Sequence, residues 1–234
     1  MNYVFAALPI VGCACVLAAA PSARADDAVP PGMVTYRSEA KLLKQYPDVA
    51  TRDGDRLEIM LGGGKRQSFK STCPIEETTD SKDCVQFALV NYDPQNDIAV
   101  IAVQRYESHK ALAIDRKSGT QIELSDMPHI APDGGYLAVV KDDQENVEFI
   151  VQAIRHAGGA FKIEGDNLDS EPCAFESWQP HDSFMIVCSD EAMQHVRERK
   201  VARGKDRKWA ATATGRSLTS AAFDALSQLP YGDE

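Results

Sequence analysis

The feature that most constrains the fold is a tight-turn sequence at residues 130–140 that leads directly into an apolar run. Pro132 presets φ for the first corner of a turn, Asp133 can bond its own backbone, and Gly134 tolerates a positive φ. The following run, residues 136–140, is apolar and partly β-branched, which is typical of a strand buried on both faces. The stretch therefore predicts a β architecture, and it indicates no activity.

The same order of turn and strand recurs along the chain. Residues 92–103 and 178–187 each place a proline in a polar turn before an apolar strand, and residues 52–61 form a fainter copy. Pro-Asp-Gly turns also precede strands in β proteins without repeats. A unit that recurs about every forty residues, however, is typical of propeller blades or solenoid turns. The aligned positions are Arg52, Pro94, Pro132 and Pro180, with spacings of 42, 38 and 48 residues.

Two segments resemble a known family. One is PDGGYLAV at residues 132–139, and the other is LAIDRKSGT at residues 112–120. They resemble the turn-and-strand core and the preceding hairpin of TolB-like, WD40-related periplasmic β-propeller repeats. The resemblance extends over residues 50–190 and is best at residues 110–140. It implies an all-β fold of about four propeller-like blades of short antiparallel strands, with short flanking helices. It implies no catalytic residue, because propeller blades carry unrelated functions.

Short apolar runs between turn signals predict that the β-propeller-like domain occupies residues 51–215. Residues 26–50 are expected to be a lead-in with a short helix at residues 38–44, begun by Ser38. Residues 216–234 are expected to form a tail or a helix. The predicted strands are 56–61, 84–91, 97–104, 110–115, 120–124, 135–141, 147–154, 160–164, 173–178, 183–189, 193–202 and 207–213.

Residues 1–25 have the pattern of a secretory signal peptide, although no Lys or Arg precedes the apolar run. A run of apolar and small residues is followed by an Ala-Arg-Ala cleavage site that ends at Ala25. A membrane anchor is one alternative, but the apolar run is short. Lipidation at Cys13 is another, although the chain stays apolar after that residue. We therefore expect a periplasmic or secreted protein with no transmembrane segment after cleavage.

The cysteine content agrees with export. Four cysteines follow the leader, and an even number in an exported chain is typical of disulfides. We expect the local pairs Cys73–Cys84 and Cys173–Cys188, because each pair flanks a turn signal. An antiparallel hairpin would also bring Cys173 and Cys188 opposite one another. The rival interpretation is a zinc site of four cysteines, which lacks the short C-x2-C spacing that would support it.

No catalytic or cofactor-binding motif stands out in the sequence. The GGGK segment at residues 62–65 lacks most of a phosphate-binding loop, and G-x-S-x-G is absent. The histidines show no ligand spacing, and the acidic runs 142–145 and 166–169 are expected to be solvated loops. We expect no cofactor, no metal and no catalytic residue. A hydrolase with a site assembled by the fold and a lipid-anchored envelope subunit remain the alternatives to a binding protein.

A basic segment contrasts with the net charge of −10 of the chain. Residues 197–208 hold seven cations and two acidic residues. The segment is either a docking patch for a protein or an anionic envelope component, or the solvated tip of a hairpin that turns at residues 204–206. If it docks a partner, reversing the charges of Arg199, Lys200 and Arg203 should weaken association and leave melting unchanged. The acidic balance argues against nucleic acid. The seven cations are Arg197, Arg199, Lys200, Arg203, Lys205, Arg207 and Lys208.

Overall fold

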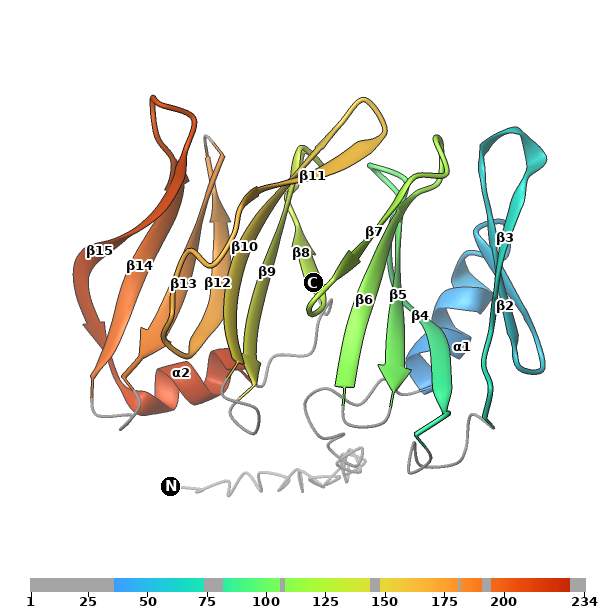
Figure 1. Ribbon diagram of the computed structural model, residues 1–234, viewed down its shortest axis with the longest axis horizontal. Helices are drawn as coiled ribbons and strands as arrows, with labels where there is room; N and C mark the ends of the chain where they lie inside the picture. Colours follow the sequence, from blue (N-terminus) through green and yellow to red (C-terminus); the bar gives the residue numbers. More distant parts are fainter. Residues whose placement is uncertain are drawn as a thin grey trace, which may run out of the picture.

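The computed structural model describes residues 36–73, 82–105, 108–143, 148–180, 182–190 and 195–227. Within these ranges the chain forms four antiparallel sheets that stand side by side in a row, together with two short helices (Figure 1). The predicted all-β class is therefore confirmed. The predicted signal peptide and Cys13 lie outside the described residues, and none of the described helices has the length and apolar character to cross a membrane.

Each sheet is built from strands that follow one another in the sequence. The first sheet contains β1 (Ala50–Asp53), β2 (Arg56–Met60) and β3 (Arg66–Lys70). The second contains β4 (Val85–Asp93), β5 (Ile98–Arg105), β6 (Ser108–Asp115) and β7 (Gln121–Leu124). The third contains β8 (Pro128–Ile130), β9 (Tyr136–Asp143), β10 (Glu148–Ala157) and β11 (Ala160–Gly165). The fourth contains β12 (Cys173–Gln179), β13 (Ser183–Ser189), β14 (Val196–Arg203) and β15 (Trp209–Leu218).

The turns that recur in the sequence occupy one equivalent place in the fold. In every sheet the recurrent turn joins the first strand to the second, so one repeat corresponds to one sheet. Each of these turns contains one residue with a positive φ, the left-handed conformation that glycine and aspartate tolerate better than bulky residues. These residues are Gly54 (56°), Asp97 (59°), Gly134 (66°) and Asp182 (52°).

The row of sheets is open. The first and fourth sheets lie at opposite ends of the long axis of the molecule, so the described residues do not close into a ring (Figure 1). The predicted units of short antiparallel strands are present as four sheets, whereas closure into a propeller is not observed in the described part of the chain.

Apolar layers between the sheets hold the row together. Alternate residues of β5 face opposite neighbours: Ile98 and Val100 pack in the layer shared with the third sheet, and Ala99 and Ile101 pack in the layer shared with the first. β9 follows the same rule between the second and fourth sheets. A strand buried on both faces requires a continuous apolar run, which explains why these strands were the easiest to predict.

The ends of the row are covered differently. Arg66, Ser68 and Lys70 of β3 are exposed on the outer face of the first sheet. Helix α2 (Ser220–Ser227) packs on the outer face of the fourth sheet, where its Phe223 contacts an apolar patch that includes Val187. Polar or covered terminal faces are what a row of stacked repeats needs in water.

Helix α1 (Tyr36–Gln45) packs against β4, and its Glu39 is only 2% exposed. The Glu39 carboxylate accepts hydrogen bonds from the Leu89 backbone nitrogen (2.8 Å) and from Arg52 Nε (2.6 Å). This pairing satisfies part of the free edge of β4. The helix begins two residues earlier than predicted, so Ser38 lies inside its first turn and does not precede the helix.

The two predicted disulfides are confirmed. Cys73 pairs with Cys84, with their Cα atoms 5.3 Å apart, and Cys173 pairs with Cys188 at 4.0 Å. Cys173 and Cys188 are direct partners in the register of β12 and β13, as the hairpin argument requires. The rival four-cysteine zinc site is thereby excluded, because all four sulfur atoms are used in the two bonds.

Candidate functional site

The recurrent turns of the third and fourth sheets border a surface hollow of about 380 Å³. Three of the turn residues singled out in the sequence, Pro132, Asp133 and Pro180, line this hollow, whereas Pro94 belongs to the corresponding turn of the second sheet. The hollow thus lies where two copies of the repeat meet. The residues that line the hollow include Pro132, Asp133, Tyr136, Trp178, Pro180 and Asp182.

Hydrogen bonds within the turns hold the rim of the hollow. The backbone nitrogen of Gly134 donates to the Ala131 carbonyl (2.8 Å), and Asp133 Oδ1 accepts from the Gly135 nitrogen (2.9 Å). In the neighbouring turn, Ser183 Oγ donates to the Pro180 carbonyl (2.9 Å). The hydrogen bond from Gly135 confirms the prediction that Asp133 bonds to the backbone of its own turn. The second carboxylate oxygen of Asp133 has no partner within the described residues.

Two aromatic side chains belong to the lining and connect it to the core. Tyr136 is 6% exposed and packs edge-on against Trp209, with ring centroids 5.2 Å apart. Trp178 packs edge-on against the fully buried Phe184 at 5.3 Å. The rings are consequently held by the apolar layer between the third and fourth sheets and cannot easily turn away.

Tyr136 and Arg203 connect the hollow to the basic hairpin. Arg203 Nη1 donates to the Tyr136 hydroxyl (3.1 Å), and Arg203 Nη2 forms an ion pair with Glu164 Oε2 (3.1 Å). Burial raises the pKa of Tyr136, the negative charge of Asp182 raises it further, and Arg203 lowers it by a smaller amount. The hydroxyl therefore keeps its proton near neutral pH.

The basic segment is divided between the interior and the surface. Arg199 Nη1 donates to Asp169 Oδ2 (2.6 Å) and Nη2 to Glu171 Oε2 (2.5 Å), and the Arg199 side chain is 21% exposed. Asp169 is only 7% exposed, so the expectation that residues 166–169 form a solvated loop was wrong for this residue. Arg199 and Arg203 are thus internal ion-pair partners.

The prediction that reversing the charges of Arg199, Lys200 and Arg203 leaves melting unchanged was therefore wrong for two of the three residues. Introducing Glu at Arg199 or Arg203 would place like charges beside partly buried carboxylates, so melting would change. Lys200 differs, because it is exposed on β14 and forms no ion pair within the described residues. Arg197 is likewise exposed on this strand.

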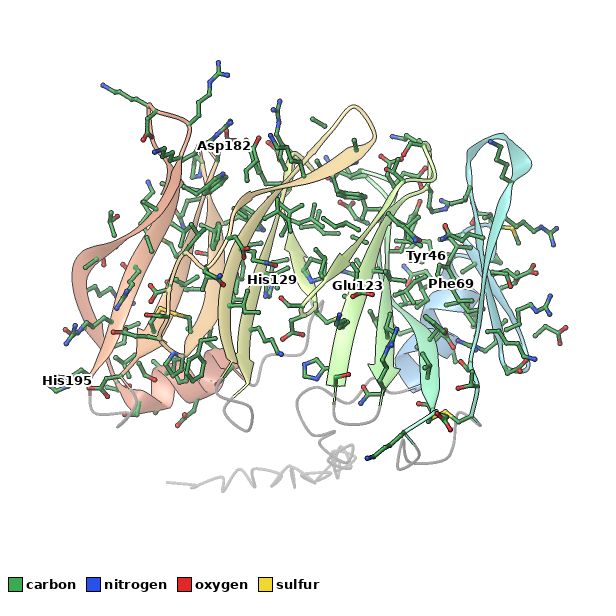
Figure 2. All side chains as sticks on the ribbon, in the orientation of Figure 1. Tyr46, Phe69, Glu123, His129, Asp182 and His195 are labelled. Atoms are coloured by element: carbon green, nitrogen blue, oxygen red, sulfur yellow. A yellow bond between two sulfur atoms is a disulfide. The ribbon has the colours of Figure 1, made fainter. Side chains whose placement is uncertain are left out.

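The remaining three cations lie at the exposed end of the β14–β15 hairpin, which we call the hairpin tip and define as residues 204–208. Gly204 donates its backbone N–H to the Lys208 carbonyl (2.7 Å), which confirms the predicted turn. Lys205, Arg207 and Lys208 are exposed, and within the described ranges their side chains form no ion pair. The Arg203 nitrogen also donates to the Asp182 carbonyl (3.4 Å), so the tip begins beside the hollow. Figure 2 shows Asp182 at the upper end of the fourth sheet, opposite His195 at the lower end.

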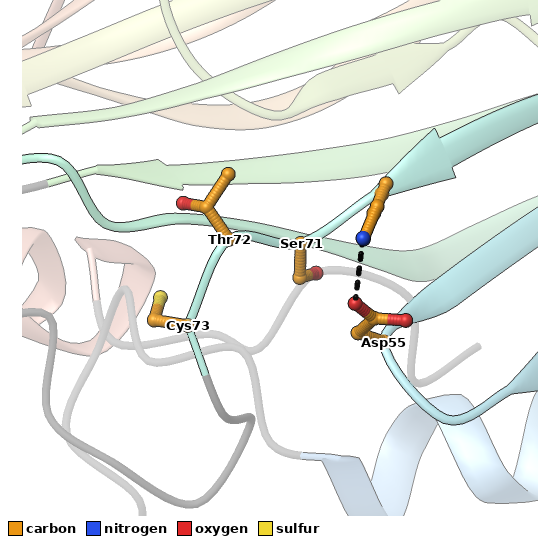
Figure 3. Close-up of a pocket in the computed structure, with 5 residues that line it drawn as sticks. Asp55, Ser71, Thr72 and Cys73 are labelled. Atoms are coloured by element: carbon orange, nitrogen blue, oxygen red, sulfur yellow. Dashed lines mark ion pairs between the residues drawn. The ribbon is translucent and has the colours of Figure 1, made fainter.

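A second hollow of about 500 Å³ lies beside the Cys73–Cys84 disulfide (Figure 3). Its polar groups are already used: Lys70 Nζ lies 3.7 Å from Asp55 Oδ2, and Ser71 Oγ accepts from the Phe87 nitrogen (3.1 Å). Thr72 Oγ1 donates to the Asp83 carbonyl (2.7 Å). The bonds of Ser71 and Thr72 tie the chain after β3 to β4 and to the residues just before it, so we interpret this hollow as structural.

The one cluster of potential metal ligands found among the described residues, and the buried His129, have structural roles. Asp169 lies within 4.8 Å of the sulfur atoms of Cys173 and Cys188, but both sulfurs are disulfide-bonded and the carboxylate is paired with Arg199. His129 stacks on Phe175 with centroids 3.9 Å apart, and burial lowers the pKa of His129 to about 4. A neutral, stacked imidazole at that position contributes packing.

The hollow and the hairpin tip lie side by side and bring carboxylates, partly buried rings and cations together. No known protein-family model matches the chain, and no curated protein matches it. The function must therefore be inferred from the chemistry of the surface. Tyr136, Trp178 and Asp182 were not identified as site residues from the sequence, although the aromatic residue before the Pro180 turn was a usable signal.

Proposed function

We propose that the protein is an exported, non-enzymatic binding protein whose hairpin tip docks an acidic region of a partner protein in the periplasm or outside the cell. The observation that carries this proposal is the presence of three exposed cations without ion pairs among five residues, in a chain of net charge −10. The leader pattern and the two disulfides support export.

The charge distribution favours a protein over an anionic membrane. A flat anionic lipid surface at the tip would also face the exposed carboxylates of Asp133 and Asp182, which it would repel. An acidic segment of a protein can contact the tip alone. The adjoining hollow also offers rings and prolines, which suit side chains better than a flat surface.

The test is a triple charge reversal at the tip, Lys205→Glu with Arg207→Glu and Lys208→Glu. Exposed charges contribute little to stability, so melting should stay unchanged. Association should slow, because charge complementarity acts mainly on the rate of encounter. For the wild type, association should weaken as salt rises above about 0.1 M, where the Debye length falls below about 10 Å. The measurement is capture of crosslinked proteins from the protein's own envelope fraction, combined with association rates at increasing salt.

The matched control is the triple reversal Lys44→Glu, Lys65→Glu and Lys117→Glu. These exposed lysines belong to α1 and to turns of the first and second sheets, and their reversal changes the net charge by the same amount. The control should keep every captured partner and the wild-type salt dependence. If the tip variant captures the same proteins as the wild type at the same rates, the hairpin tip is only a solvated turn.

A further inference from the structure

We propose that the hollow beside the hairpin tip binds a cationic side chain, best an arginine, from the same partner segment whose acidic residues pair with the tip. This inference rests on the docking function proposed above and adds a specificity to it. It would make the partner segment bipolar, with a basic anchor and an acidic run.

The charged groups of the hollow are hydrogen-bond acceptors. Asp133 and Asp182 are exposed, and within the described part of the chain neither carboxylate forms an ion pair. Asp133 uses one oxygen for the Gly135 nitrogen and keeps the other free. Arg203, whose backbone nitrogen donates to the Asp182 carbonyl, directs its side chain to Tyr136 and Glu164. No Lys or Arg lines the hollow within the described residues, so a cationic ligand side chain suits it.

The aromatic rings of the hollow favour arginine over lysine. A guanidinium is planar, stacks on aromatic faces and donates two hydrogen bonds side by side to a carboxylate. Trp178 and Tyr136 supply rings at the same place where Asp133 and Asp182 supply carboxylates. Cation–π attraction and charge-assisted hydrogen bonds then act on one side chain.

The tip cations begin close to the hollow. The backbone carbonyl of Asp182 accepts a hydrogen bond from the Arg203 nitrogen, and Lys205 follows Arg203 by two residues, in the turn itself. A partner segment can therefore reach both places with a short spacer between its arginine and its first acidic residue.

The carboxylates of the hollow also distinguish ligand classes. A phosphate or a lipid headgroup at the tip would approach Asp133 and Asp182, and these like charges disfavour it. A peptide that carries both signs of charge avoids this repulsion. The hollow therefore selects a protein segment in which a basic residue precedes or follows an acidic run.

The probe is the synthetic peptide Arg-Gly-Gly-Glu-Asp-Glu with blocked ends, compared with the same peptide carrying Gln in place of Arg. The chain contains two tryptophans, so the Trp209→Phe variant leaves Trp178 as the single reporter inside the hollow. Peptide titrations at about 0.05 M salt should change Trp178 emission. The Gln peptide should bind roughly tenfold more weakly than the Arg peptide.

The matched variant is Asp133→Asn with Asp182→Asn. Asparagine can keep the turn hydrogen bond of Asp133, so folding should be preserved, and thermal melting checks this. In this variant the difference in affinity between the two peptides should shrink, because the arginine has lost its charged partners and keeps only the aromatic rings. The triple reversal at the tip should weaken both peptides by the same factor.

Three results would overturn the inference, each in a recognisable way. If both peptides bind equally to the wild type and both depend on the tip, the hollow has no role while the docking function stands. If the Arg peptide depends on the two carboxylates but not on the tip, the bipolar segment is wrong and the docking function fails. If phosphatidylglycerol vesicles bind through the tip and neither peptide binds, the partner is a membrane.

Discussion

At the scale of single residues, the packing of Gly134 shows how the recurrent turns are constrained. Gly134 has φ +66°, and a Cβ atom added there would lie 2.1 Å from Cγ of Asn96 in the corresponding turn of the second sheet. Its carbonyl also accepts a hydrogen bond from His156 Nδ1 at 2.9 Å, if that nitrogen carries the proton. Glycine is thus required both by its backbone conformation and by its close neighbour.

We predict that Gly134→Val destabilises the protein more than Gly158→Val. Gly158 also has a positive φ, +61°, so both variants should lose about 1–3 kcal/mol from backbone strain. Only Gly134 adds a collision, because no atom lies within 4 Å of a Cβ at Gly158. Urea unfolding of both variants measures the difference, and equal free energies of unfolding would contradict the close contact with Asn96.

At the scale of elements, polar contacts between strand ends join neighbouring sheets. At the end of β6, Asp115 lies 2.7 Å from Nε2 of His156 on β10, while His156 Nδ1 faces the Gly134 carbonyl. The imidazole can donate to both acceptors only when both nitrogens carry protons. Ser118 donates its backbone N–H to Asp115 Oδ1 (2.7 Å). The contacts of His156 join the second sheet to the third at one end of their strands, and Ser118 holds Asp115 in place for this contact.

We predict that this contact is lost in acid. Burial raises the pKa of Asp115, but hydrogen bonds from Ser118 and His156 outweigh burial and hold that pKa below its usual value of 3.8. The unfolded chain therefore takes up this proton at a higher pH than the folded protein. The stabilisation is fully present above about pH 4 and disappears as the pH falls through the folded pKa.

Melting curves from about pH 6 to about pH 2 check this prediction with Asp115→Asn. The variant should start less stable than the wild type, and the difference should shrink toward the acidic end. Asp224→Asn, which changes an exposed carboxylate on α2, is the control and should run parallel to the wild type. A difference between Asp115→Asn and the wild type that does not vary with pH would contradict the role of the charge.

At the scale of the whole molecule, an open row has two end faces that a closed ring would not have. The outer face of the first sheet is exposed and polar at β3, as described above. The fourth sheet instead presents Ala174, Val187 and Val196 to α2, where Phe223 is 1% exposed. An uncovered apolar end face would favour stacking of one molecule on another.

We predict that Phe223→Ala lowers the free energy of unfolding by about 3–5 kcal/mol, because a large buried ring is removed from the apolar layer. The variant should also associate, because the end face loses part of its cover. Denaturant unfolding and light scattering measure the two effects. Ala225→Ser, at an exposed position of the same helix, should change neither. Wild-type stability and light scattering in Phe223→Ala would show that α2 is dispensable.

Much of the fold was encoded locally and could be predicted. All twelve strands predicted from apolar runs and turn signals are present, although their ends differ by a few residues. The predictions missed β1, β3 and β8, which are short. β1 and β3 also alternate with exposed polar residues. Hydrophobic periodicity indicates a strand only where burial requires apolar side chains. Short strands with one solvent-exposed face are therefore hard to predict from the sequence.

Twelve strands, the recurrent turns and the two disulfides could be predicted from the sequence, because each depends on residues close together in the chain. Which cations of the basic segment are already paired could be learned only from the folded structure. The alternation of β14 and the packing of the third sheet against the fourth place Arg199 beside Asp169, and Arg203 beside Glu164 and Tyr136. Charge pairing and loss of solvent act across space, so a run of basic residues cannot reveal which of its members are already neutralised.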